Sequence, residues 1–91
     1  MEETTEQGIV FVVDDDPAIR SYLEALIQSV QLRPMLYESA PAFLEAYRGE
    51  GPACLLLDVR MPGVSGFDLQ EELGRRNIDV PVIMMTGFAE V

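Results

Sequence analysis

Short apolar runs that end on oxygen-bearing side chains constrain the fold of this chain more than any other feature. The run Cys54–Leu57 leads directly into Asp58, and Ile9–Val13 leads into three aspartates in succession. A third run, Val80–Met85, leads into Thr86. Short apolar runs bounded by turn signals are typical of strands buried on both faces, as in parallel sheets. We therefore predict a strand at each of the three runs, buried on both faces at Ile9–Val13 and at Cys54–Leu57.

Between these runs, apolar residues recur at helical spacing. Pro17 stands where the first residue of a helix is expected, and Asp16 before it can cap the helix and complement its dipole. We predict a helix from about Pro17 to Val30, with one buried stripe made of Ile19, Leu23, Leu26, Ile27 and Val30.

Caps and apolar spacing predict three further elements. Ser39 can cap a second helix, whose inward-facing residues are expected to be Phe43, Leu44 and Tyr47. Asn77 can take the left-handed position that ends a third helix, which is marked by Phe67, Leu69 and Leu73. The segment Arg33–Glu38 is predicted to be an edge strand, because Pro34 has no N–H to give to a neighbouring strand.

Strands that alternate with helices form a parallel sheet with helices on both faces. The wholly apolar runs Ile9–Val13 and Cys54–Leu57 belong at the centre of such a sheet. We therefore predict the α/β fold class, as a doubly wound, flavodoxin-like parallel sheet in the strand order 2-1-3-4. Because ligands bind outside the carboxyl ends of the strands in such sheets, this order brings Asp14, Asp15 and Asp58 together.

Charge and composition restrict what the chain can bind. The 91 residues include 16 acidic and 6 basic ones, which gives a net charge of −10. This balance argues against nucleic acid or a membrane as a partner, and it suits a cation site. The acidic start and the lack of a long apolar stretch favour a cytoplasmic protein, with residues 1–8 as a flexible tail and residues 9–91 as one domain. Cys54 is expected to be a buried thiol.

Carboxylates that lie close together repel one another, and a bound cation relieves the repulsion. Mg²⁺ suits such a site, because it takes oxygen ligands and usually keeps several waters. The carboxylate of Asp58 could also act as a nucleophile and form an aspartyl phosphate, to which Thr86 could donate a hydrogen bond. Simpler interpretations remain open: Asp14–Asp16 as a solvated turn with a helix cap, and Asp58 and Thr86 as ordinary strand-end residues.

Three motifs resemble the response-regulator receiver domain of bacterial two-component signalling. They are residues 12–16 (VVDDD), 57–66 (LDVRMPGVSG) and 81–87 (PVIMMTG). They are similar to the motifs of FixJ-type regulators, which carry a helix-turn-helix DNA-binding domain after the receiver. The resemblance covers the chain from Ile9 onward.

The resemblance implies a role for each candidate residue. Asp58 is the expected phosphoacceptor, and Thr86 is the expected switch hydroxyl that moves toward the phosphoryl group. Mg²⁺ is expected to be bound by Asp15, by Asp58 and by the backbone carbonyl of Arg60, with Asp14 acting on the metal directly or through water. The phosphoryl group is expected to come from a histidine kinase or a small phosphodonor, so the domain is not an independent enzyme.

The sequence departs from this family on its C-terminal side. Receivers have a fifth strand and two more helices, whereas this chain ends just after the predicted fourth strand. The chain also contains no lysine, so the lysine that contacts the phosphoryl group in the family has no counterpart. We therefore expect a receiver that is truncated after the fourth strand. We also expect a homo-oligomer that covers the apolar edge at Val82–Met85 and the uncovered sheet face.

Two functions compete at this point. The first is a receiver module with Mg²⁺-dependent phosphorylation of Asp58, impaired by the truncation. The alternative is a signalling-inactive fragment that serves as an oligomerising or structural module. A phosphatase with an aspartate nucleophile fits less well, because such enzymes need a second acid two residues after the nucleophile and Arg60 stands there.

Overall fold

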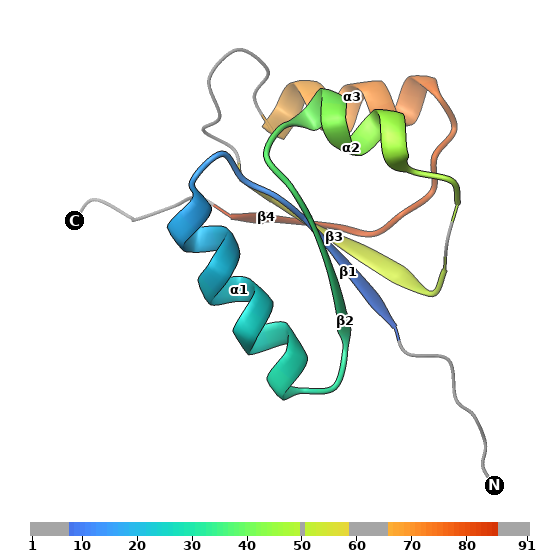
Figure 1. The fold of residues 1–91 in the computed structure, drawn as a ribbon. Coiled ribbons are helices and arrows are strands. Elements are labelled where there is room, and N and C mark those ends of the chain that lie inside the picture. The colour runs from blue at the N-terminus through green and yellow to red at the C-terminus, as the bar shows by residue number, and fades with distance from the viewer. Residues whose placement is uncertain (1–7, 50, 59–65, 86–91) are drawn as a thin grey trace, which may run out of the picture.

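The computed structural model describes residues 8–49, 51–58 and 66–85. In this part of the chain, four parallel strands form one sheet with helices on both faces (Figure 1). The strand order is β2-β1-β3-β4, which confirms the predicted order 2-1-3-4 and the doubly wound sheet. The predictions for the tail at residues 1–7, for Arg60 and for Thr86 lie outside the described residues.

The two central strands are β1 (Ile9–Val13) and β3 (Ala53–Asp58), which pair directly with each other. The outer strands are β2 (Arg33–Tyr37), beside β1, and β4 (Val82–Met85), beside β3. Pro34 lies in β2 at the edge of the sheet, as its missing N–H predicts.

The strand β4 is shorter than the predicted strand at Val80–Met85. Pro81 has no N–H to give to a neighbouring strand, although its carbonyl accepts the N–H of Leu55 at 2.9 Å. Val80 is 8% exposed, so it packs into the core from the connecting segment instead of from the strand.

Three helices connect the strands: α1 (Pro17–Ser29), α2 (Ala40–Ala46) and α3 (Gly66–Arg75). The helix α1 lies on one face of the sheet, and α2 and α3 lie side by side on the other (Figure 1). None of the helices in the described part of the chain has the length and apolar character that crossing a bilayer requires.

The predicted ends of these helices are confirmed. The side chain of Asp16 accepts the N–H of Ala18, and the side chain of Ser39 accepts the N–H of Ala42. Asn77 follows α3 with a φ of 57°, which is the left-handed conformation expected where a helix ends.

The larger core lies under α2 and α3. Phe11 and Phe43 are fully buried there, with ring centroids 5.2 Å apart in an edge-to-face arrangement. Tyr37 and Tyr47 pack against both rings and extend the aromatic cluster. Four aliphatic residues of the same core are also fully buried: Val13, Leu55, Leu57 and Leu69.

The face under α1 is covered less completely. Val10, Val12 and Ile27 are buried on this face, whereas Leu56 and Cys54 are half-buried. The prediction of a strand buried on both faces is therefore right for β1 and only partly right for β3. The thiol of Cys54 was expected to be buried, and it is not, because one helix leaves part of this face open.

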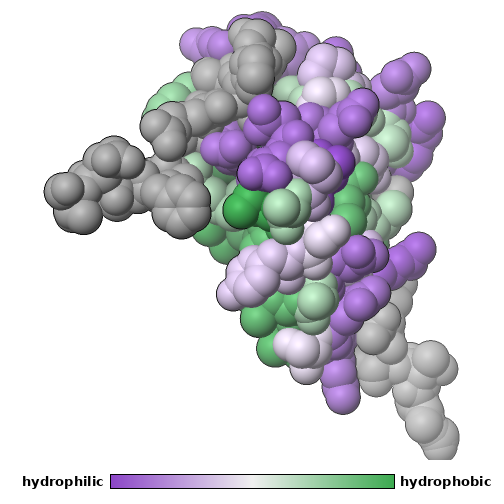
Figure 2. Space-filling model, turned by 60° about the vertical axis from the view of Figure 1, so that its left-hand side comes forward, coloured by the Kyte–Doolittle hydropathy of each residue, from purple (hydrophilic) through white to green (hydrophobic). Residues whose placement is uncertain are grey.

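Some residues predicted to face inward are exposed. Leu26 and Val30 are 47% and 60% exposed, because α1 touches the sheet along a line narrower than the predicted stripe and Val30 is already the residue after the helix. Phe67, an expected marker of the third helix, is also exposed. Ile83 is exposed too, but it belongs to the segment Val82–Met85, which was expected to form an apolar edge. Figure 2 brings the side that carries α1 forward and shows green apolar surface among purple hydrophilic residues.

Candidate functional site

Asp14 comes directly after β1, at the carboxyl edge of the sheet. Its N–H donates to the carbonyl of Tyr37 at 3.1 Å, which continues the pairing of β1 with β2 by one residue. Its Oδ1 accepts the N–H of Asp16 at 2.9 Å, and the residue is only 4% exposed. The turn after β1 thus holds this carboxylate in a fixed, buried position.

Arg20 of α1 ties the helix to the same turn. Its Nη1 donates to the backbone carbonyl of Asp14 at 2.8 Å, and its N–H donates to the carbonyl of Asp16 at 3.0 Å. The sequence reasoning did not single out Arg20. The available signal was its spacing, because a residue one turn after a helix cap points its side chain back toward the start of the helix.

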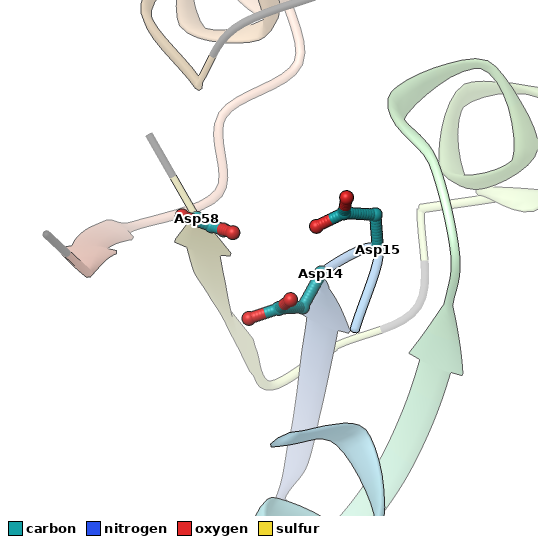
Figure 3. Close-up of side chains that lie close together, drawn as sticks. All are labelled: Asp14, Asp15 and Asp58. Carbon is teal, nitrogen blue, oxygen red and sulfur yellow. The ribbon is translucent and has the colours of Figure 1, made fainter. Parts of the chain in front are cut away.

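The structure brings three of the predicted carboxylates together. Asp14, Asp15 and Asp58 each have a carboxylate oxygen within 4.8 Å of those of the other two. Asp58 is the last residue of β3, and Figure 3 shows its carboxylate and that of Asp15 pointing toward each other from the ends of β3 and β1. Asp14 is buried, Asp58 half-buried and Asp15 exposed, so the cluster opens to solvent on one side.

The electrostatics of this cluster favour a bound cation. Burial raises the pKa of the Asp14 carboxyl, and the negative charges of Asp58, Asp15 and Asp16 raise it further, against the lowering effect of the hydrogen bond from the Asp16 N–H. A divalent cation would offset the same repulsion without a proton. The donor set consists of oxygens only and is open to water, which fits Mg²⁺.

The other predicted site residues have different places. Asp16 is the N-cap of α1, where its Oδ1 accepts the N–H of Ala18 at 2.9 Å, so it supports the turn and is not part of the three-carboxylate cluster. Arg60 and Thr86 lie outside the described residues, and their roles stay predictions.

Comparison with known proteins places this arrangement in a family. The model of the response regulator receiver domain matches residues 10–91. The chain is 43% identical over 89 residues to nodulation protein W of Bradyrhizobium diazoefficiens, covering 98% of this chain and 39% of that protein. The chain spans about two fifths of the length of the curated relatives it matches.

Solved structures of response regulators have the same fold. Full-length FixJ from B. japonicum matches with a TM-score of 0.83 and 37% identity, over 92% of this chain and 41% of that one. The response regulator TrrA of Thermotoga maritima, solved with Mg²⁺ and beryllofluoride, matches with a TM-score of 0.80 and 26% identity, over 91% of this chain and 72% of that one. TrrA has also been solved in complex with the histidine kinase ThkA.

Receiver domains typically bind Mg²⁺ in an acidic pocket, and the cluster of Asp14, Asp15 and Asp58 has the composition of such a pocket. The family match over most of the chain, the strand order and the three converging carboxylates agree with one another. The chain belongs to the response regulator receiver domain family.

Proposed function

We propose that this chain is a phosphoacceptor module in which Asp58 takes up a phosphoryl group in the presence of Mg²⁺. The observation that carries the proposal is the convergence of the Asp14, Asp15 and Asp58 oxygens within 4.8 Å of one another. A solvated turn would explain Asp14 and Asp15 after β1, and an ordinary strand end would explain Asp58 of β3. Neither interpretation explains why carboxylates from two different strands lie together. The convergence therefore favours a metal-assisted reaction over the simpler interpretations.

In the proposed reaction, a carboxylate oxygen of Asp58 attacks the phosphorus of a phosphodonor. An O–P bond forms on Asp58, the bond from phosphorus to the donor breaks, and its electron pair leaves with the donor. Asp14 and Asp15 would hold the metal together with Asp58. Mg²⁺ bound there would supply positive charge that offsets the negative charge on the phosphoryl oxygens.

We further propose the roles that the family resemblance gives to residues outside the described part. The carbonyl of Arg60 is the remaining protein ligand of the metal, and the hydroxyl of Thr86 responds to the phosphoryl group. The donor is the phosphohistidine of a kinase or a small acyl phosphate, in line with the complex of TrrA with a histidine kinase. Control of transcription, which the names of several relatives state, is likewise a proposal for this chain.

The test is a response to beryllofluoride, which mimics a phosphoryl group on a carboxylate. With Mg²⁺ present, we expect the amide signals of residues near Asp58 to shift in an ¹⁵N-resolved NMR spectrum, and we expect no such shift in the isosteric variant Asp58→Asn. Mass spectrometry should show that acetyl phosphate adds one phosphoryl group to the unaltered chain and none to Asp58→Asn. No response in the unaltered chain would favour the alternative, a signalling-inactive structural module.

We also propose that the chain associates with itself through β4 and the face under α1. Among the described residues, β4 pairs only with β3, and Ile83 on it is 53% exposed. Exposed strand edges and apolar patches of this kind promote association. A sedimentation experiment over a range of concentrations should show a rising average mass, and a constant monomer mass would contradict the proposal.

A further inference from the structure

A hollow between α2 and α3 shares no residue with the acidic cluster. It has a volume of about 360 Å³, which lies within the range of pockets that accept an organic group. Its apolar lining comes from both helices: Leu69 of α3, and Ala40, Pro41 and Leu44 of α2. Ala40 and Leu69 are buried beneath it, Leu44 is half-buried and Pro41 is exposed. The apolar side chains that solvent reaches in the hollow are therefore those of Pro41 and Leu44, which lie above the buried Ala40 and Leu69.

Acidic residues of α3 line the same hollow. They are Asp68, Glu71 and Glu72, and the one cation that lines it is Arg75. Arg75 forms an ion pair with Glu72, which also pairs with Arg76 at 2.8 Å. Hydrogen bonds from Arg76 and Arg75 lower the pKa of Glu72, so this carboxylate stays charged. It can therefore keep its ion pair with Arg75, which lies in the same helix. The lining therefore combines an apolar floor with a net negative rim.

We propose that this hollow docks a basic amphipathic segment of a partner protein. One large apolar side chain of the segment packs into the hollow against Pro41 and Leu44, and a flanking lysine or arginine lies against the carboxylate of Glu71. Complementary charge steers association and fixes the orientation of the segment, while the apolar contact supplies most of the affinity.

Charge also argues against other occupants of the hollow. Residues 1–7 of this chain contain three glutamates and no basic residue, so they are repelled by the acidic rim. A second copy of the chain has 16 acidic and 6 basic residues, so it offers few basic segments to this rim, and the surface proposed for self-association lies at β4 and under α1 instead. Nucleic acid, which is also an anion, does not fit this surface.

The test uses two synthetic peptides of equal charge. The first is Arg-Lys-Leu-Leu-Arg-Lys, and the second has serine in place of both leucines. In an NMR titration of the ¹⁵N-labelled chain, the leucine peptide should shift the amide signals of Ala40, Leu44 and Leu69. It should bind at least about tenfold more tightly than the serine peptide, because a leucine side chain leaves water on binding. Equal affinity, or shifts centred on another face, would overturn the proposal.

Two variants distinguish binding in the hollow from an effect of the chain's net charge on peptide binding. Glu71→Lys changes the rim, and Asp79→Lys makes the same change in charge at an exposed position outside the lining. We expect Glu71→Lys to weaken binding of the leucine peptide about tenfold, and Asp79→Lys to weaken it less than about twofold. A similar loss in both variants would mean that only the net charge matters, which contradicts a docking site at this place.

Discussion

The two faces of the sheet are built from alternate residues of the same strands, yet they differ in how completely they are covered. Leu55 and Leu57 are fully buried under α2 and α3, whereas Leu56 between them is half-buried on the side of α1. Ile83, in register with Leu56, is 53% exposed. Apolar burial thus concentrates on one face, and the other face depends more on individual links such as the bond from Arg20 to Asp14.

The largest expected effect compares two neighbouring leucines on opposite faces. Leu55→Ala should lower the free energy of unfolding by about 2–5 kcal/mol, because it leaves a cavity in a closed core. Leu56→Ala removes the same atoms from a half-open face and should cost about 1–2 kcal/mol. Urea unfolding followed by circular dichroism measures both, and equal losses would mean that the two faces are packed equally well.

The next effect concerns the polar link that fastens α1 to the acidic turn. Arg20→Gln removes a charged hydrogen bond to the carbonyl of Asp14 and should cost about 1–2 kcal/mol, less than a buried core leucine. Because this bond also holds the backbone beside the proposed metal ligands, Mg²⁺ affinity should fall several-fold. The control Arg33→Gln removes the same charge from an exposed residue of β2. Removal of a positive charge by itself should strengthen the binding of a cation, so Arg33→Gln is expected to keep or slightly raise Mg²⁺ affinity. An equal loss of affinity in both variants would mean that the link from Arg20 to Asp14 does not hold the metal ligands in place.

The sequence was sufficient to predict the order of the strands. Alternating strands and helices leave few topologies, and the two wholly apolar runs had to be central. The caps at Asp16 and Ser39 were also predictable, because they depend on residues adjacent in the chain. The meeting of Asp14, Asp15 and Asp58 followed from the strand order alone, since parallel strands end at one edge.

Features that depend on how elements cover one another were not predictable in this way. Helical spacing identified the apolar residues of α1, but it did not show that Leu26 and Val30 would lie outside the line of contact with the sheet. The half-burial of Cys54 likewise depends on how much of its face one helix covers. The spacing of Arg20 from the helix cap indicates that its side chain points toward the start of α1, but the acceptor that it reaches, the carbonyl of Asp14, depends on how the turn after β1 folds.

A smaller effect, of opposite sign, is expected at Asp14. Its pKa is raised by burial and by neighbouring carboxylates, so the folded state binds a proton more readily than the unfolded state. Stability is therefore lost as the pH rises through the folded pKa, where this carboxyl ionises in its buried position. Asp14→Asn keeps an oxygen that can accept the Asp16 N–H and should raise the free energy of unfolding at pH 7 by about 1 kcal/mol.

The gain from Asp14→Asn should shrink as the pH falls below the ordinary range of a carboxyl group, because both states of the unaltered chain are then protonated. Thermal unfolding from pH 3 to pH 7 measures this trend. Added Mg²⁺ should stabilise the unaltered chain at pH 7 and stabilise the variant much less, since a metal ligand is lost. If Asp14→Asn is less stable at pH 7 than the unaltered chain, the charged form of Asp14 does not destabilise the folded state.

The smallest effect on stability is expected at the most open point of the α1 face. Ile83→Thr keeps a β-branched residue in β4 and should change the free energy of unfolding by less than about 0.5 kcal/mol, because the side chain is half exposed already. The neighbouring residue Met84 packs against the larger core, under α2 and α3, so Met84→Thr should lower the free energy of unfolding clearly more.

The same two variants test where copies of the chain meet. If they meet at the face under α1, Ile83→Thr should reduce self-association in sedimentation, and Met84→Thr should leave it unchanged at an equal concentration of folded chain. A large loss of stability in Ile83→Thr would mean that Ile83 is buried in solution. The two faces of the sheet would then be covered more equally than the exposure of their side chains indicates.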